Sequence, residues 1–87
     1  MLEKRYKCPC CGYHTYTIPV KQAHGSICPV CYWENDTCIS SDSEPSDSNH
    51  GITLAEAIQN FKKIGACEKG MLPYVRPPQG GEIEVKD

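Results

Sequence analysis

The chain has few of the large apolar residues from which a protein core is built. Its 87 residues include one Trp, one Phe and five Tyr. A domain this short buries a modest share of its surface, so packing alone gives it little stability. The sequence has no run of about 18 apolar residues, so we expect no membrane span. Residues 1–7 carry no apolar stretch behind their basic residues, so we also expect no secretory signal and a cytoplasmic protein.

Basic charge is scarce too, and it is unevenly placed. The formal net charge is −2. Residues 1–33 carry +3 and residues 57–87 carry +1, whereas residues 34–56 hold six acidic residues and no Lys or Arg, giving −6. A chain that binds phosphates shows a basic patch, which this one lacks. The charge therefore disfavours nucleic acid as a partner.

Cysteine, by contrast, is abundant, with seven among 87 residues. At this level small domains are held together by disulfides or by metal ions. Thiols stay reduced in the cytosol and serve there as metal ligands, and an odd number of them cannot pair completely within one chain. We therefore expect metal binding rather than disulfides.

Four of the cysteines form a metal-binding motif. Cys8, Cys11, Cys28 and Cys31 have the spacing C-x2-C-x16-C-x2-C. Each pair can curl around one ion in a tight turn, here called a knuckle, and two knuckles complete a tetrahedral site of four sulfurs. Four thiolates favour Zn²⁺, or iron under some preparation conditions. We predict one structural Zn²⁺ that contributes about 10–16 kcal/mol at neutral pH, as much as the net stability of a domain.

Two other functions of this motif are less favoured. A catalytic zinc keeps one position open for water, which four Cys ligands do not leave. A redox dithiol normally lies at the start of a helix in a βαβ unit, and the sequence shows no such unit.

The other Cys and His residues show no pattern of a second site. Cys10 lies inside the first knuckle, where it either exchanges as a ligand or points away; Cys67 is expected to be a small buried thiol, and Cys38 borders a polar loop. We expect surface or half-buried positions for the three histidines, whose spacing suggests neither a metal triad nor a catalytic base: His14, His24 and His50.

The predicted fold is a small α+β, metal-stabilised domain over residues 1–78. Its first part, residues 6–38, is expected to be a zinc-ribbon or rubredoxin-like knuckle, hairpin, knuckle unit. In that unit residues 13–18 form a strand because β-branched and aromatic residues dominate them. Residues 40–50 contain no apolar residue and are predicted to be a solvated, acidic loop.

One α-helix follows, at about residues 54–64. Thr53 and Glu56 fit a capping box, an apolar stripe with Phe61 as its main core anchor follows, and Gly65 ends the pattern. Past the helix, residues 71–78 contain three prolines and are predicted to pack as an extended strap. Residues 79–87 are predicted to be a loose tail.

The acidic region also suggests an interaction surface. The residues proposed to contact a partner are Trp33, Glu34, Asp36, Asp42, Glu44 and Asp47. For Trp33 the favoured alternative is a core position that covers the zinc site, because a single Trp is usually buried.

The chain resembles the cysteine-rich CPCC family of small bacterial proteins. The resemblance covers nearly all of residues 8–78 and rests on Cys-Pro-Cys-Cys-Gly at 8–12, Ile-Cys-Pro-Val-Cys-Tyr-Trp-Glu-Asn-Asp at 27–36, the helix, Gly-Ala-Cys at 65–67 and Val-Arg-Pro-Pro at 75–78. It implies a bacterial or phage source and a zinc-ribbon-like fold, and it implies no particular reaction. The family commonly has two Asp after the Trp-Glu pair, where this chain has Asn35 first.

We therefore expect a zinc-binding protein-interaction module without a catalytic site: an adaptor, an inhibitor or an immunity-type protein, with another protein as its partner. A nucleic-acid-binding zinc ribbon is the alternative, using an aromatic and basic face at Tyr6, Lys7, Tyr13, Tyr16 and Lys21. A hydrolase or a thiol oxidoreductase is the second alternative.

Overall fold

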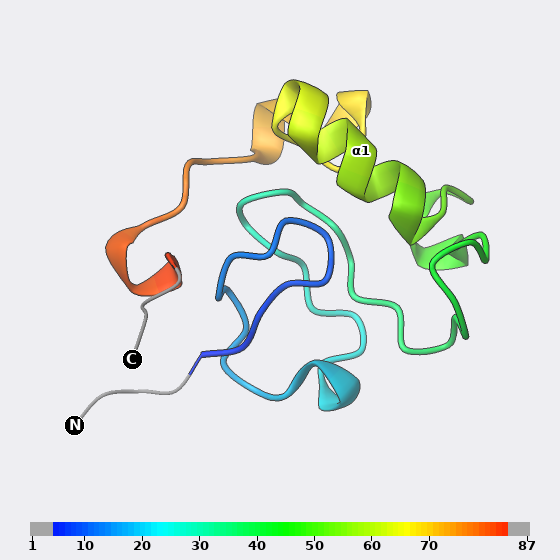
Figure 1. Ribbon diagram of the computed structural model, residues 1–87, viewed down its shortest axis with the longest axis horizontal. Helices are drawn as coiled ribbons and strands as arrows, with labels where there is room; N and C mark the ends of the chain where they lie inside the picture. Colours follow the sequence, from blue (N-terminus) through cyan, green and yellow to red (C-terminus); the bar gives the residue numbers. More distant parts are fainter. Residues whose placement is uncertain (1–4, 84–87) are drawn as a thin grey trace.

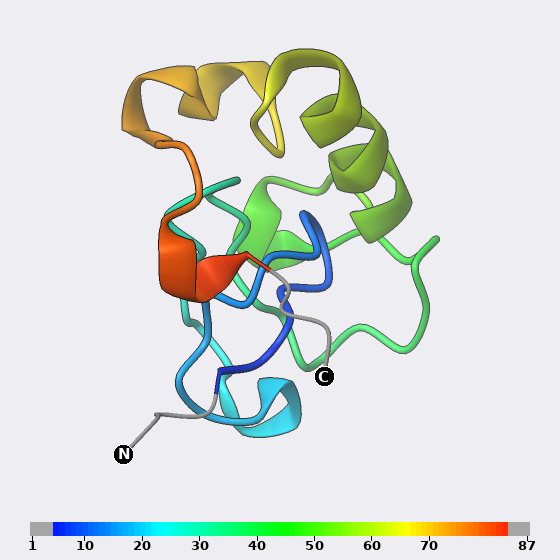
Figure 2. The ribbon, with the colours of Figure 1, turned by 60° about the vertical axis from the view of Figure 1, so that its left-hand side comes forward.

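The computed structural model describes residues 5–83. Its elements, in chain order, are η1 (Val20–Gln22), η2 (Asp47–Asn49), α1 (Leu54–Ile64), η3 (Lys69–Tyr74) and η4 (Gly80–Glu82), where η denotes a 3-10 helix. Figure 1 shows α1 lying across one end of the two irregular, Cys-bearing segments, and Figure 2 shows η3 beside α1 on the same end. The Cys-bearing half has no regular element longer than η1, so regular backbone hydrogen bonding alone does not stabilise it.

Helix α1 begins and ends where its capping residues predict. The Thr53 hydroxyl accepts a hydrogen bond from the Glu56 N–H, and the Glu56 carboxylate accepts one from the Thr53 N–H, both at 3.0 Å. These two bonds satisfy amides of the first turn that have no partner within the helix. At the other end, Gly65 has φ 83° and donates to the Phe61 carbonyl.

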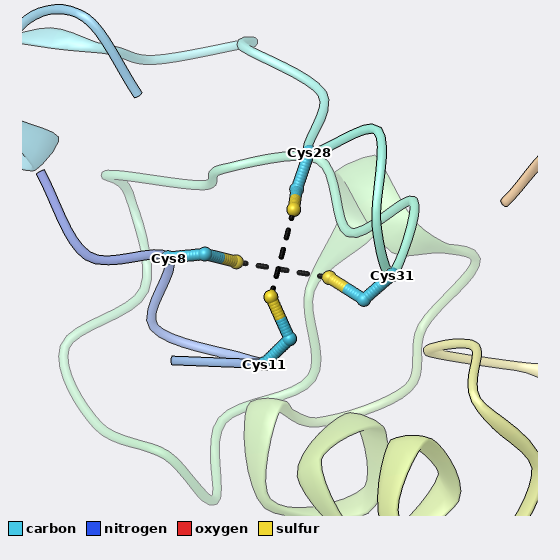
Figure 3. A group of neighbouring side chains, drawn as sticks. All are labelled: Cys8, Cys11, Cys28 and Cys31. Carbon is cyan, nitrogen blue, oxygen red and sulfur yellow. Dashed lines mark hydrogen bonds between the residues drawn. The ribbon is translucent and has the colours of Figure 1, made fainter. Parts of the chain in front are cut away.

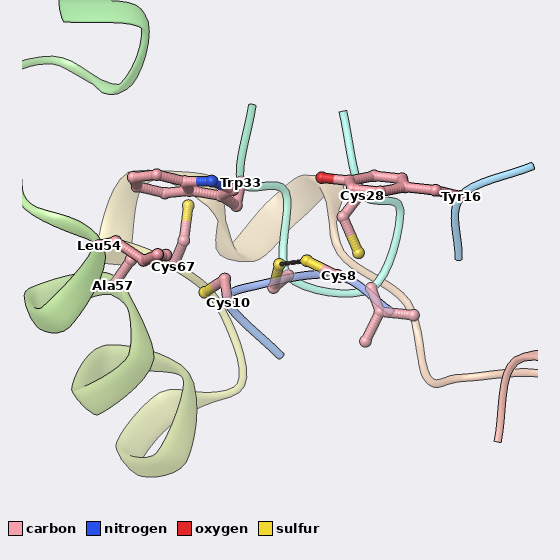
Figure 4. Packing of buried hydrophobic residues seen from close by; sticks show 10 residues of the cluster. Cys8, Cys10, Tyr16, Cys28, Trp33, Leu54, Ala57 and Cys67 are labelled. Carbon is pink, nitrogen blue, oxygen red and sulfur yellow. Dashed lines mark hydrogen bonds between the residues drawn. The ribbon is translucent and has the colours of Figure 1, made fainter. Parts of the chain in front are cut away.

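The core lies between α1 and the cysteines. Leu54 and Ala57 are the helix residues that are buried, and they face Trp33 and Cys67 (Figure 4). Phe61 is only half-buried, so its prediction as the main anchor is wrong; its ring meets Tyr13 edge-on at 6.3 Å. Ala57 is fully buried in the same cluster as Trp33 and Cys67, and its small side chain leaves room for them.

The predicted hairpin strands are not found within residues 5–83, which contain three isolated antiparallel bridges: Tyr6 with Tyr16, Ile27 with Glu34, and Pro45 with Thr53. The expected strand at residues 13–18 fails because its amides bond elsewhere. The N–H of His14 donates to the Glu82 carbonyl, and that of Thr15 donates to the Tyr13 carbonyl. Tertiary partners thus override the β-propensity of these residues.

The predicted solvated loop at residues 40–50 is partly buried. Ser46 is fully buried and Asn49 is 4% exposed. The Asn49 side chain pairs with the backbone of Glu34, accepting from its N–H at 2.9 Å and donating to its carbonyl at 2.8 Å. One amide side chain therefore docks an otherwise polar loop on the segment that follows the second knuckle.

The predicted extended strap is wrong for residues 71–74, because η3 covers Lys69–Tyr74 and contains Pro73. Val75, which follows η3, has an extended backbone. A 3-10 helix needs φ near −60°, which the proline ring already imposes, so Pro73 fits η3.

The predicted loose tail is ordered up to Ile83, and residues 84–87 lie outside the described part of the chain. Glu82 in η4 is 5% exposed, and Arg76 donates to its two carboxylate oxygens at 2.8 and 2.7 Å. This bidentate ion pair holds η4 against the segment around Arg76. Among residues 5–83, no helix has the length and apolar character needed to cross a bilayer.

Candidate metal centre

The two knuckles have the same backbone geometry. In the first, the Cys8 N–H donates to the Tyr13 carbonyl at 2.8 Å, and the Gly12 N–H donates to the Cys8 carbonyl at 2.9 Å. In the second, Cys28 and Tyr32 repeat these bonds, with Trp33 in place of Tyr13, at 3.0 and 2.7 Å. The residue after each second cysteine is left-handed, with φ 81° at Gly12 and φ 67° at Tyr32. Both turns therefore point two thiols toward a common centre.

The four predicted ligands meet at that centre. The Sγ atoms of Cys8 and Cys31 are 3.7 Å apart, as are those of Cys11 and Cys28, and all four sulfurs lie within 4.8 Å of one another. Figure 3 shows the two sulfur pairs crossing at one point. A disulfide would bring two sulfurs to about 2.05 Å. A tetrahedral Zn²⁺ with Zn–S bonds of about 2.3 Å places its sulfurs about 3.75 Å apart, so the residues present fit this ion.

The site is closed to solvent on most sides. Cys8, Cys28 and Cys31 are at most 1% exposed, and Cys11 is half-buried. The Thr15 hydroxyl donates a hydrogen bond to the Cys28 sulfur at 3.1 Å. Four protein thiols fill a tetrahedral shell, which is the arrangement of a structural rather than a catalytic metal ion.

The thiols perturb one another strongly. Hydrogen bonds from neighbouring thiols, led by Cys11, hold the pKa of Cys28 far below its ordinary value. Contact with Cys28 raises the pKa of Cys11, and contact with Cys10 raises that of Cys31. Four negative sulfurs cannot share this volume unless a cation neutralises them. A bound divalent ion deprotonates its thiol ligands, so the cluster has the chemistry of a cation site.

The rest of the chain is tied to the second knuckle. The Cys67 N–H, just past α1, donates to the Cys31 carbonyl at 2.8 Å, and the Arg76 N–H donates to the Pro29 carbonyl at 3.2 Å. Figure 4 shows the rings of Trp33 and Tyr16 beside the buried cysteines. Burial, together with the nearby thiols, raises the pKa of Tyr16, so its hydroxyl stays protonated. The second knuckle of the candidate metal centre is thus tied to the residues just past α1 and to the segment around Arg76.

Comparison with known proteins agrees with the geometry. The model of the family described as Cysteine-rich CPCC matches residues 6–82. The chain belongs to the cysteine-rich CPCC family. The matched range covers both knuckles, α1 and the Arg76–Glu82 pair, so this CPCC protein carries the family pattern over the whole described fold. No curated protein and no solved structure matched it in the other two comparisons.

The remaining cysteines of this CPCC protein lie in two different environments. Cys10 and Cys67 are buried, and burial raises the pKa of the Cys67 thiol to about 12, so that thiol is unreactive. Neither belongs to the four-sulfur group. Cys38 is exposed, beside His24 and Asp36.

The other two histidines lie apart from the metal centre. His14 is half-buried, and its Nε2 atom has no hydrogen-bond partner within the described chain. His50 is exposed and contacts the Glu68 carboxylate at 2.6 Å.

The residues predicted to form an interaction surface are not all available to a partner. Trp33 is 1% exposed, so its ring packs in the core and does not offer an aromatic contact. Glu34, Asp36 and Glu44 are half-buried, whereas Asp42 and Asp47 are exposed. The acidic residues therefore remain as candidates, and the favoured interpretation of Trp33 as a core residue is confirmed.

Sequence reasoning missed three polar residues that organise the site. The Asn35 amide is buried and donates to the carbonyls of Val20 and Ala23 at 2.7 and 3.2 Å, which pins the segment around η1. Asn49 holds the polar loop, and Glu82 holds the C-terminal segment. An amide is needed at position 35, because it donates hydrogen bonds that a carboxylate cannot.

Proposed function

We propose that this CPCC protein is a protein-interaction module built on one structural Zn²⁺. The observation that supports it best is the closed set of four sulfurs, three of them buried, which leaves the ion no position for a substrate or an activated water. The metal then serves to hold two knuckles together, and function lies on the surface that they support. An adaptor, an inhibitor or an immunity-type protein fits this description.

The contact surface we assign is an acidic groove. It has a volume of about 450 Å³ and lies over Trp33, with an apolar lining from Val20, Ile39 and Leu54. Asp36 and Asp42 give it negative charge, which Lys21 in the same lining offsets in part. Apolar lining with a charged rim is the usual composition of a recognition surface. Since residues 34–56 carry a formal −6, the partner we infer is a protein that presents basic side chains.

Nucleic acid fits this surface less well. Two of the aromatic residues considered for base stacking are used inside the protein, because Tyr16 is 4% exposed and Tyr13 packs against Phe61. A thiol oxidoreductase fits less well too, since three of the four motif thiols are buried rather than presented to a substrate.

Affinity capture from the native host tests the proposal. The zinc-loaded protein and two charge-reversal variants, Asp42→Lys in the groove and Lys62→Glu on the exposed side of α1, serve as baits after nuclease treatment. We expect one defined protein with the wild type and Lys62→Glu baits, and loss of that protein with Asp42→Lys, while metal content stays at one ion per chain. Capture that disappears on nuclease treatment, or is equal for all three baits, contradicts the proposal.

A further inference from the structure

A second group of metal-ligating side chains lies outside the four-sulfur centre. His24, Asp36 and Cys38 each offer one ligand atom, and the three atoms lie within 4.8 Å of one another. They line a hollow of about 200 Å³ together with Glu44 and Asp47. His24 and Cys38 are exposed and Asp36 is half-buried, so solvent and ions reach this group directly.

The fold holds the carboxylate of this group in a fixed orientation. The buried Ser46 hydroxyl donates to Oδ2 of Asp36 at 2.7 Å, and the Cys38 N–H donates to Oδ1 at 2.9 Å. The Ser46 bond is also the main reason that the pKa of Asp36 is lowered. Each carboxylate oxygen has two lone pairs, so one on each remains for a cation. Hydrogen bonds of this kind orient carboxylate ligands in metal sites.

The imidazole is held beside the same residues. Its Nδ1 atom accepts a hydrogen bond from the Thr37 N–H at 3.1 Å and lies 2.9 Å from the Thr37 hydroxyl. A metal ion would compete for the Nδ1 lone pair with that amide. The exchange costs the exposed contacts to Thr37, whose amide and hydroxyl can turn to water instead.

We propose that His24, Asp36 and Cys38 form a second, exchangeable Zn²⁺ site. One nitrogen, one oxygen and one sulfur ligand suit this borderline-soft ion, and three protein ligands leave a fourth position for water. On binding, the Cys38 thiol loses its proton to solvent and the thiolate joins the ion. Glu44 and Asp47 in the same hollow add negative potential that favours a cation. This site does not depend on the interaction proposed above.

Titration of the holoprotein with Zn²⁺ tests the second site. Protein that already holds one ion per chain is titrated by calorimetry, and the reaction of a thiol reagent with Cys38, the exposed cysteine among the seven, is followed in parallel. We expect a second ion per chain and slower modification of Cys38 when Zn²⁺ is present.

Three variants make the test specific. Cys38→Ser and His24→Gln should each weaken the second binding event by more than about tenfold, a loss that even outer-shell partners of a metal site can cause. His50→Gln, a matched change at another exposed histidine, should leave it unchanged. Stoichiometry that stays at one ion per chain, or a second ion retained by Cys38→Ser and His24→Gln, overturns the proposal.

Discussion

At the scale of single residues, the two knuckles differ at one equivalent position. Gly12 and Tyr32 both follow the second cysteine of a knuckle, and both have positive φ. Glycine adopts this conformation freely, whereas a residue with a Cβ atom is strained by roughly 1–2 kcal/mol. At Tyr32 the ring stacks on Tyr74, with centroids 5.3 Å apart, which offsets part of this strain.

Replacement of Gly12 by Ala should destabilise the zinc-loaded protein by about 1–2 kcal/mol. A Cβ at Gly12 would have no atom within 4 Å, so the expected loss comes from the backbone alone. Gly70→Ala, where a Cβ also meets nothing and φ is not positive, is the matched control and should change stability little. Denaturant unfolding measures both, and equal values for the two variants would contradict this account of the knuckle.

Cys10 and Cys11 are adjacent in the sequence, and substituting each in turn tests which of them is a metal ligand. Cys11→Ser should lower the Zn²⁺ content well below one ion per chain, because a serine hydroxyl is a far weaker ligand than a thiolate. Cys10→Ser should retain the ion, since Cys10 is buried but not part of the four-sulfur group. Metal analysis of the two purified variants checks the assignment, and equal zinc content in both would count against it.

At the scale of elements, α1 has a strong local start signal. Thr53→Ala removes the hydroxyl that accepts from the Glu56 N–H, and we expect a loss of about 1 kcal/mol, which is typical for such a cap. Thr17→Ala, at an exposed position outside any helix, should have little effect. Thermal unfolding of the two variants gives the comparison, and an unchanged Thr53→Ala would mean that packing alone sets the helix start.

The C-terminal segment depends on the pair between Arg76 and Glu82. Hydrogen bonds from Arg76 lower the pKa of Glu82 below its ordinary value. A carboxyl group whose pKa is lower in the folded state stabilises that state above its unfolded pKa of about 4.3, and this contribution disappears as pH falls through the folded value. Glu82→Gln should therefore lower the melting temperature at pH 7, and its difference from the wild type should persist down to about pH 4 and shrink as the pH falls further.

The same substitution elsewhere serves as the control for this prediction. Glu68→Gln removes a contact to His50, whose side chain is 62% exposed, and exposed pairs contribute little. Melting curves in excess zinc separate the effect from metal loss. A Glu82→Gln difference that does not vary with pH would show that the ion pair is not its cause.

The elements also show which features the sequence could reveal. The knuckles and α1 were predicted correctly because their signals are local: cysteine spacing, a capping box and a helix-ending glycine within a few residues of one another. The hairpin strands were predicted wrongly, and the burial within the polar loop and the contacts of the tail were missed, because hydrogen bonds from distant segments decide them. The backbone carbonyl of Glu82 accepts a hydrogen bond from residue 14, its carboxylate accepts one from residue 76, and the Asn49 side chain accepts one from residue 34. No periodic pattern in the sequence predicts such contacts.

At the scale of the whole molecule, the two proposed metal sites have different tasks. The four-sulfur centre joins both knuckles and is tied to the end of α1 and the residues around Arg76, so we expect the fold to depend on it. The group at His24, Asp36 and Cys38 lies at the surface, and we expect the fold not to depend on an ion bound there. We therefore expect a mild chelator to remove the outer ion first and leave the protein folded.

Removal of the inner ion tests the central claim most directly. Trp33 is the single Trp and is 1% exposed beside the metal centre, so its fluorescence reports on this part of the fold. We predict that a strong chelator, by extracting the last Zn²⁺, shifts Trp33 emission to the red and abolishes cooperative melting, and that returning Zn²⁺ restores both. A metal-free protein with unchanged emission that still melts cooperatively would contradict the account.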